Sequence, residues 1–182
     1  IITFKHDYDI KKTGKYLSPK ELDSFYENKE DFIIIDTRND YEYEQGHFKD
    51  AIKINSKEFS EFPKEVSKLK KLAKGKKVVT YCTGGVRCEK ATAWMKDNGF
   101  DDVYQLDGGV INYGIEQGES NWEGRCFVFD DRGSINIDPS KQDEEYIQYY
   151  KLVHPRKKTD KFDKSLRVFN NSPWSNIMTS ST

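Results

Sequence analysis

The chain has 182 residues, which is enough for one ordinary domain with an appendage but not for two large domains. Its 30 Lys and Arg nearly cancel its 31 Asp and Glu, and the formal charge of -1 excludes a global basic field for nucleic acid. The sequence lacks both an apolar run of the roughly 20 residues that span a bilayer and a signal peptide, so we expect a soluble, cytoplasmic protein with no membrane partner.

Three cysteines, an odd number, argue against a disulfide scaffold and favour a reducing compartment. The first residue is Ile1 and not Met, which is typical of a segment of a longer protein. We expect three parts: residues 1–12 as the remnant of an N-terminal linker, 13–135 as the main domain, and 136–182 as a C-terminal extension.

Helices and strands are predicted to alternate along the chain. Ser18, Pro19 and Glu21 form a helix-start signature, followed by inward-facing Leu22 and Phe25. Further helices are predicted at 63–75, 89–98 and 107–114, and buried strands at 31–36, 51–55, 77–81 and 102–106. Because this alternation is typical of βαβ units, we predict an α/β fold with a parallel sheet and helices on both faces.

The stretch VVTYCTGGVRCEKATAWM, residues 78–95, runs from a strand through Cys82 into a helix. Ligands of such sheets bind at the carboxyl ends of the strands, where Cys82 lies. The loop that can curl around its sulfur, with backbone N–H groups inward, consists of Thr83, Gly84, Gly85, Val86 and Arg87. The helix start and the Arg87 charge should both lower the pKa of the thiol and favour the nucleophilic thiolate. The alternative is a buried structural cysteine beside a tight turn.

Several motifs in a fixed order carry a family resemblance. They are Asp36-Thr37-Arg38, Glu42-Tyr43, Gly46-His47, Ala51, the Cys82 loop and Leu106-Asp107-Gly108-Gly109. This order resembles a rhodanese domain, and over roughly residues 13–135 the chain is similar to the rhodanese-containing tRNA uridine 5-hydroxylase family. The resemblance implies a rhodanese-like three-layer α/β/α sandwich with a central parallel sheet, in which Cys82 corresponds to the persulfide-forming cysteine. Asp50 replaces a glycine that is usual in the family.

The resemblance implies an enzyme that hydroxylates the wobble uridine of tRNA, with molecular oxygen as co-substrate and no evident cofactor. One alternative is a sulfurtransferase that takes sulfur from thiosulfate or another small sulfane-sulfur donor. A non-catalytic rhodanese-like binding module is a third hypothesis, although it has no need of an activated thiol. A phosphatase is disfavoured because four residues separate Cys82 from Arg87, where related phosphatases have five.

Other candidate residues receive simpler interpretations. Asp36 and Arg38 are expected to form a structural ion pair, although Arg38 could also face a substrate, and His47 is expected to pack near the Asp36 loop. Cys88 is interpreted as a small filler in preference to a resolving thiol. Cys126 is predicted in a core strand. We expect no metal site, because no close ligand pair such as C-x-x-C occurs. Because Arg87 belongs to the loop, we expect its replacement by alanine to impair chemistry more than folding.

Two basic segments could meet the phosphates of tRNA. Residues 63–77 hold seven Lys against one Glu, and residues 151–168 hold seven Lys and Arg against two Asp. For both, a structural interpretation is favoured: a solvated helix face in the first, and short helices that wrap the domain in the second. If RNA binds, its affinity should fall with salt and depend on the basic residues of 156–167.

Overall fold

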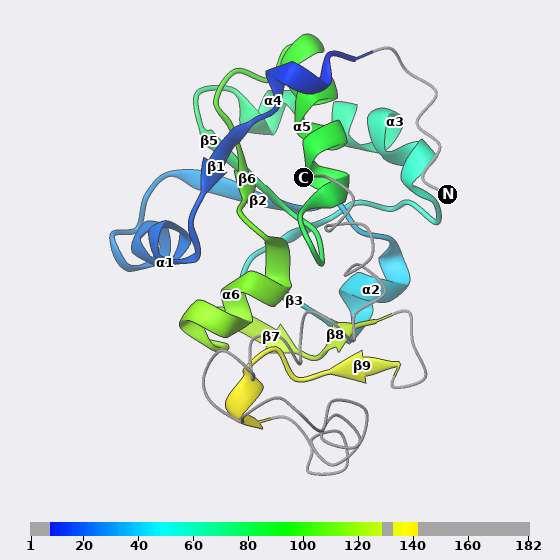
Figure 1. Ribbon diagram of the computed structural model, residues 1–182. Helices are drawn as coiled ribbons and strands as arrows, with labels where there is room; N and C mark the ends of the chain where they lie inside the picture. Colours follow the sequence, from blue (N-terminus) through cyan, green and yellow to red (C-terminus); the bar gives the residue numbers. More distant parts are fainter. Residues whose placement is uncertain (1–7, 129–132, 142–182) are drawn as a thin grey trace.

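A five-stranded parallel sheet forms the centre of the fold (Figure 1). The computed structural model describes residues 8–128 and 133–141. The strands of the sheet are β1 (Lys15–Leu17), β2 (Phe32–Asp36), β4 (Ile52–Lys53), β5 (Lys77–Tyr81) and β6 (Val103–Leu106). Their spatial order is β1-β6-β5-β2-β4, and every neighbouring pair is parallel. The predicted parallel sheet is confirmed.

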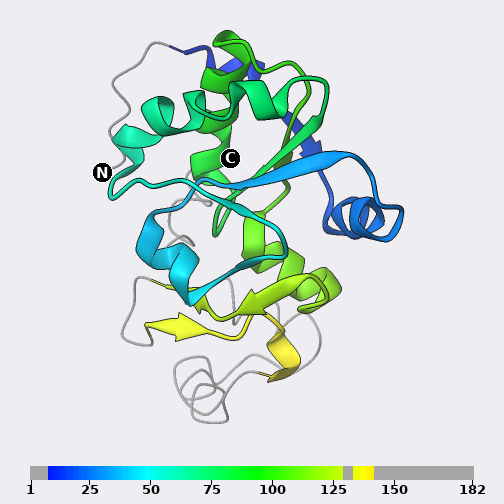
Figure 2. The ribbon, with the colours of Figure 1, turned by 180° about the vertical axis from the view of Figure 1, so that it is seen from behind.

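Helices cover both faces of this sheet, so the predicted three layers are confirmed as well. On one face lie α3 (Phe62–Ser67), α4 (Lys70–Ala73) and α5 (Val86–Asp97), above the sheet in Figures 1 and 2. On the other lie α1 (Pro19–Glu27) and α6 (Gly109–Gln117). The remaining helices are α2 (Asp40–Gln45) and three short 3-10 turns, η1 (Ile10–Lys12), η2 (Phe59–Glu61) and η3 (Pro139–Lys141).

Two small antiparallel pairs lie below the sheet in both views. Strand β3 (Gly46–Phe48) pairs with β7 (Trp122–Gly124), and β8 (Cys126–Phe127) pairs with β9 (Ser134–Ile135). The predicted core strand around Cys126 is therefore present.

Alternate residues of the buried strands enter two separate cores. Ile34 and Val79 pack on the side of α1 and α6. Ile33, Ile35 and Val78 pack on the side of α3, α4 and α5. Because successive side chains of a strand point to opposite faces, continuous apolar runs are what a sheet buried on both faces requires.

The starts and ends of the helices follow local signals in most places. Ser18 accepts a hydrogen bond from the Glu21 N–H, and the Glu21 carboxylate accepts one from the Ser18 N–H, as the capping box predicts. Helix α5 begins at Val86, three residues before the predicted start at Glu89, because Gly85 adopts a left-handed conformation with φ of 92° and turns the chain directly into the helix.

The single helix predicted at 63–75 is wrong, because the segment forms α3 and α4 with a break between them. The N–H groups of Lys68 and Leu69 bond three residues back, as in a 3-10 turn, and Leu69 has φ of -91° and ψ of -2°. The Ser67 hydroxyl bonds to the Pro63 carbonyl and competes for the helical backbone. Val66 and Ala73 are nevertheless buried, as predicted.

Asp50 stands where a glycine is usual in the family, and its backbone adopts a conformation typical of glycine. Asp50 has φ of 60°, in the left-handed region that glycine adopts without strain and that Asp tolerates better than most residues. The turn before Ala51 thus keeps the conformation that a glycine would supply.

Residues 142–182 lie outside the described part of the chain, and so do the predicted tail helices, the basic stretch 151–168 and the role assigned to 136–182. The boundaries of the three predicted parts stay predictions. Among the described residues, no helix is long and apolar enough to cross a membrane.

Candidate active site

Cys82 follows β5 directly and occupies the carboxyl end of the sheet, as the sequence predicts. The Gly85 N–H donates a hydrogen bond to Cys82 Sγ over 3.1 Å. Thr83 and Gly84 complete the tight turn before α5, and both are buried. Only 1% of Cys82 is exposed, so its sulfur is held inside the loop and does not project from it.

The start of α6 fixes the other side of this loop. Val110 and Ile111 donate their N–H groups to the carbonyls of Cys82 and Thr83 over 3.0 and 3.1 Å. Gly109 makes the approach possible, because a Cβ there would lie 2.5 Å from the Cys82 carbonyl oxygen and its φ is 65°. The motif Leu106-Asp107-Gly108-Gly109 therefore serves to bring α6 against the cysteine loop.

The surroundings of Cys82 favour its thiolate. Burial acts to raise the pKa of this thiol, but a hydrogen bond from the Cys88 thiol, the charge of Arg87 and the backbone N–H groups of Cys88 and Gly85 together lower the pKa to about 6. At neutral pH most molecules therefore carry a sulfur nucleophile at this position.

Cys88 lies in the first turn of α5 and is fully buried. Thr37 Oγ1 lies 3.5 Å from its sulfur. Burial is the main reason why the pKa of the Cys88 thiol lies well above its ordinary value. Hydrogen bonding to Cys82 and the negative charge of Cys82 raise this pKa further. The two neighbouring thiols therefore share a single negative charge, which resides on Cys82.

Arg87 has a partner that the sequence analysis missed. Its Nη1 and Nη2 donate to the two carboxylate oxygens of Glu42, in α2, over 2.7 and 2.8 Å. Glu42 also accepts the Asn39 N–H over 3.0 Å. The side chains of Arg87 and Glu42 are 3% and 0% exposed. Replacement of Arg87 would leave a buried carboxylate without its counter-ion, so we expect this change to destabilise the fold as well. That it impairs chemistry more than folding stays a prediction.

The signal for Glu42 was present in the sequence. Asn39 and Glu42 have the spacing of a capping box, and Glu42-Tyr43 belongs to the ordered motifs. Its contact with Arg87 could not be inferred, because 45 positions separate the two residues.

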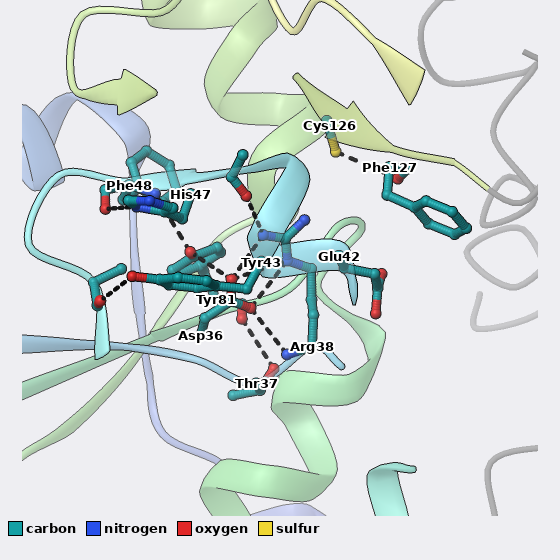
Figure 3. A network of polar contacts seen from close by, with 12 residues as sticks. Asp36, Thr37, Arg38, Glu42, Tyr43, His47, Phe48, Tyr81, Cys126 and Phe127 are labelled. Atoms are coloured by element: carbon teal, nitrogen blue, oxygen red, sulfur yellow. Dashed lines mark hydrogen bonds and ion pairs between the residues drawn. The ribbon is translucent and has the colours of Figure 1, made fainter. Parts of the chain in front are cut away.

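A second buried ion pair supports the strand end beside Cys82 (Figure 3). Arg38 Nη2 lies 2.7 Å from Asp36 Oδ2, and the Tyr81 hydroxyl donates to the same oxygen over 2.7 Å. Arg38 also donates to the Gly46 carbonyl over 2.7 Å. The Arg38 side chain is fully buried and paired with Asp36, so the predicted structural ion pair is confirmed. That Arg38 also faces a substrate stays a prediction.

The remaining candidates lie around this network. The His47 ring stacks on Tyr43, with ring centroids 4.2 Å apart, and its Nδ1 is 2.9 Å from the Phe48 carbonyl oxygen. Cys126 is fully buried, and burial raises the pKa of its thiol to about 11. Within residues 8–128 and 133–141, no group of three or more His, Cys, Asp or Glu is arranged to hold a metal ion.

Comparisons with known proteins agree with this geometry. The profile of the family described as Rhodanese-like domain matches residues 18–115. A tRNA uridine(34) hydroxylase of Cytophaga hutchinsonii is 48% identical over 71% of this chain and 41% of that protein. One from Bacillus licheniformis is 48% identical over 75% of this chain and 44% of that protein. The chain thus spans less than half the length of these relatives.

A solved structure shares the fold. The thiosulfate sulfurtransferase from Pseudomonas aeruginosa superposes with a TM-score of 0.52 at 20% identity, over 61% of this chain and 20% of that one. At this identity the likeness concerns the fold alone.

Proposed function

Because the chain belongs to the rhodanese-like domain family, we propose that Cys82 is its reactive nucleophile and that the protein hydroxylates uridine 34 of tRNA. The observation that carries this proposal is the place of Cys82 at the carboxyl end of β5, where its sulfur accepts the Gly85 N–H over 3.1 Å and its surroundings lower its pKa to about 6. Such a sulfur is ionised at neutral pH and can attack an electrophilic carbon or sulfur atom.

The substrate is inferred from the relatives, two of which are named tRNA uridine(34) hydroxylase and are 48% identical over about three quarters of this chain. We infer the same nucleotide as substrate and molecular oxygen as co-substrate. A thiolate can assist oxygenation by adding to C6 of the uracil ring, because addition there makes C5 electron-rich. A tRNA substrate would place the protein in the cytoplasm.

Sulfur transfer is the second candidate function, and the shape of the loop favours it over phosphate chemistry. Gly85 offers its N–H to a single sulfur atom, and both terminal nitrogens of Arg87 donate to Glu42. A small sulfane-sulfur donor such as thiosulfate could then load Cys82 with one sulfur atom as a persulfide.

Nucleoside analysis of tRNA from cells that lack the protein separates the two functions. The hydroxylase predicts loss of the oxygen at C5 of uridine 34, restored by the wild-type gene and by Cys126→Ala but not by Cys82→Ala. The sulfurtransferase predicts unchanged hydroxylation together with loss of sulfur-containing nucleosides. Unchanged hydroxylation in the deletion strain would exclude the proposed function.

A further inference from the structure

The burial of the reactive sulfur constrains how a tRNA base approaches it. Only 1% of Cys82 is exposed, whereas a base in an RNA loop stacks on its neighbours. To reach this sulfur, uridine 34 must leave the stack, as target bases do in other enzymes that carry out chemistry on a base. The neighbouring base then loses one of its stacking surfaces, and an aromatic side chain beside the site would replace that surface.

Tyr16 presents such a ring to solvent. At 56% exposed, it is the most exposed large hydrophobic side chain among the described residues. It lies in β1, an edge strand of the sheet. Its hydroxyl donates to Glu89 Oε1 over 3.3 Å. Glu89 belongs to the first turn of α5, so this hydrogen bond ties the ring to the helix that follows the cysteine loop.

A second link joins β1 to the Cys82 loop through the backbone. The carbonyl at the end of β1 accepts the Asp107 N–H over 2.9 Å. A Cβ added to Gly85, within the loop, would lie 3.5 Å from the nitrogen of the next residue, Gly108. Figure 1 shows β1 beside β6, with the start of α5 next to them. The exposed ring therefore lies near the carboxyl end of the sheet, which is also the place of the reactive sulfur.

The charges near Tyr16 determine which part of RNA suits this surface. Glu89 is partly exposed and Asp107 is exposed. Their carboxylates repel a phosphate group, but they do not repel a neutral base. A carboxylate also accepts hydrogen bonds from the N–H groups at the edge of a base. The surface thus favours the face and the edge of a base over the phosphate backbone.

We propose that Tyr16 is a stacking platform for a base next to uridine 34, and that Glu89 accepts an N–H group of this base. The proposal rests on the proposed hydroxylase function and names the part of the substrate that this surface binds. Glu89 uses Oε1 for the Tyr16 hydroxyl and offers its second carboxylate oxygen to the base. Partial burial and then Glu89 raise the pKa of Tyr16 above its ordinary value, so the ring stays uncharged at neutral pH.

The alternative role of this pair is to fasten β1 to α5. That role needs the Tyr16 hydroxyl, whereas stacking needs the ring. Tyr16→Phe removes the hydroxyl and keeps the ring, and Tyr16→Ala removes both. Leu72→Ala is the matched control, because Leu72 is 46% exposed and lies in α4, which leads into the amino end of β5.

The test uses the full-length protein and an RNA hairpin with the anticodon stem and loop, in which the fluorescent base 2-aminopurine stands next to uridine 34. Wild type, Tyr16→Phe and Leu72→Ala should bind with equal affinity and quench the fluorescence by stacking. Tyr16→Ala should bind roughly 5- to 100-fold more weakly, the range for one base stacked on an aromatic side chain, and should lose the quenching. The salt dependence of its binding should not change, because no contact with a phosphate is lost.

Each of the other outcomes has one meaning. If wild type hydroxylates uridine 34 but Tyr16→Ala binds and quenches as wild type does, the stacking proposal alone fails. It also fails if Tyr16→Phe loses as much affinity as Tyr16→Ala, since the hydroxyl contact would then be what matters. Slower sulfur loading of Cys82 from thiosulfate in Tyr16→Ala, with unchanged RNA binding, would assign the ring to a sulfur donor instead. If wild type neither binds the hairpin nor hydroxylates tRNA, the proposed function fails and the inference fails with it.

Discussion

Removal of Arg87 should destabilise the fold as well as change the reactive thiol. The change Arg87→Met leaves Glu42 buried, with the Asn39 N–H as its remaining hydrogen-bond donor among the described residues. Removal of one partner of a buried ion pair costs about 3–5 kcal/mol, which for a protein of this size lowers the melting temperature by on the order of 10 °C. That cost is a large fraction of the roughly 5–15 kcal/mol that stabilises a typical domain.

The double variant Arg87→Met with Glu42→Gln is the matched control. Neither charge remains, and the glutamine still offers an oxygen to the Asn39 N–H, so the loss of stability should fall to about 1 kcal/mol. The pKa of Cys82 should rise in both variants, because the Arg87 charge lowers it.

Urea denaturation measures the stability of these variants, and the pH dependence of thiol alkylation measures the pKa. Equal destabilisation of the single and the double variant would refute the reasoning, because the cost would then come from packing. So would a single variant within about 0.5 kcal/mol of wild type, the range of ordinary surface substitutions.

Three further predictions concern the loop and the partner. Gly109→Ala should cost about 2 kcal/mol or more and impair the loop, because its Cβ would meet backbone oxygens at 2.5 and 2.6 Å. The control Gly75→Ala, with φ of 77° and open space around it, should cost only about 1–2 kcal/mol of backbone strain. The rate of Cys82 alkylation should be half-maximal near pH 6. Cys88→Ala should move this midpoint upward, because Cys88 lowers the pKa of Cys82. An unchanged midpoint would contradict this influence of Cys88. Neutralisation of the basic residues of 156–167 should flatten the salt dependence of tRNA binding. Each lost ion pair between a basic side chain and a phosphate should change the slope by about one unit. Binding that does not depend on salt would argue against such ion pairs.

The fold could be predicted because its signals are local. Capping residues, apolar runs and their alternation fix the elements, and the crossover rules fix a parallel sheet. Where the prediction was wrong, short-range competition decided the outcome, as in the break at Leu69 between α3 and α4. The period of the apolar residues remained helical across that break, so Val66 and Ala73 still reached the core.

The site could be predicted only in part. Cys82 and its glycines stand next to each other in the sequence, so their geometry follows from one turn. The residues that contact the loop from other elements are distant in the sequence, so their positions do not follow from the turn. Glu42 is the clearest case. Cys88 was interpreted as a filler in preference to a resolving thiol, and the structure places it in the first turn of α5, fully buried.

The position of Arg87 decides what kind of anion the loop can hold. An arginine that binds phosphate must present its N–H groups to the ligand, but here both terminal nitrogens bond to Glu42. The charge of Arg87 lowers the pKa of Cys82, while the Gly85 N–H bonds directly to the sulfur over 3.1 Å. Such a loop stabilises one charged sulfur atom, which suits sulfur chemistry better than phosphoryl transfer.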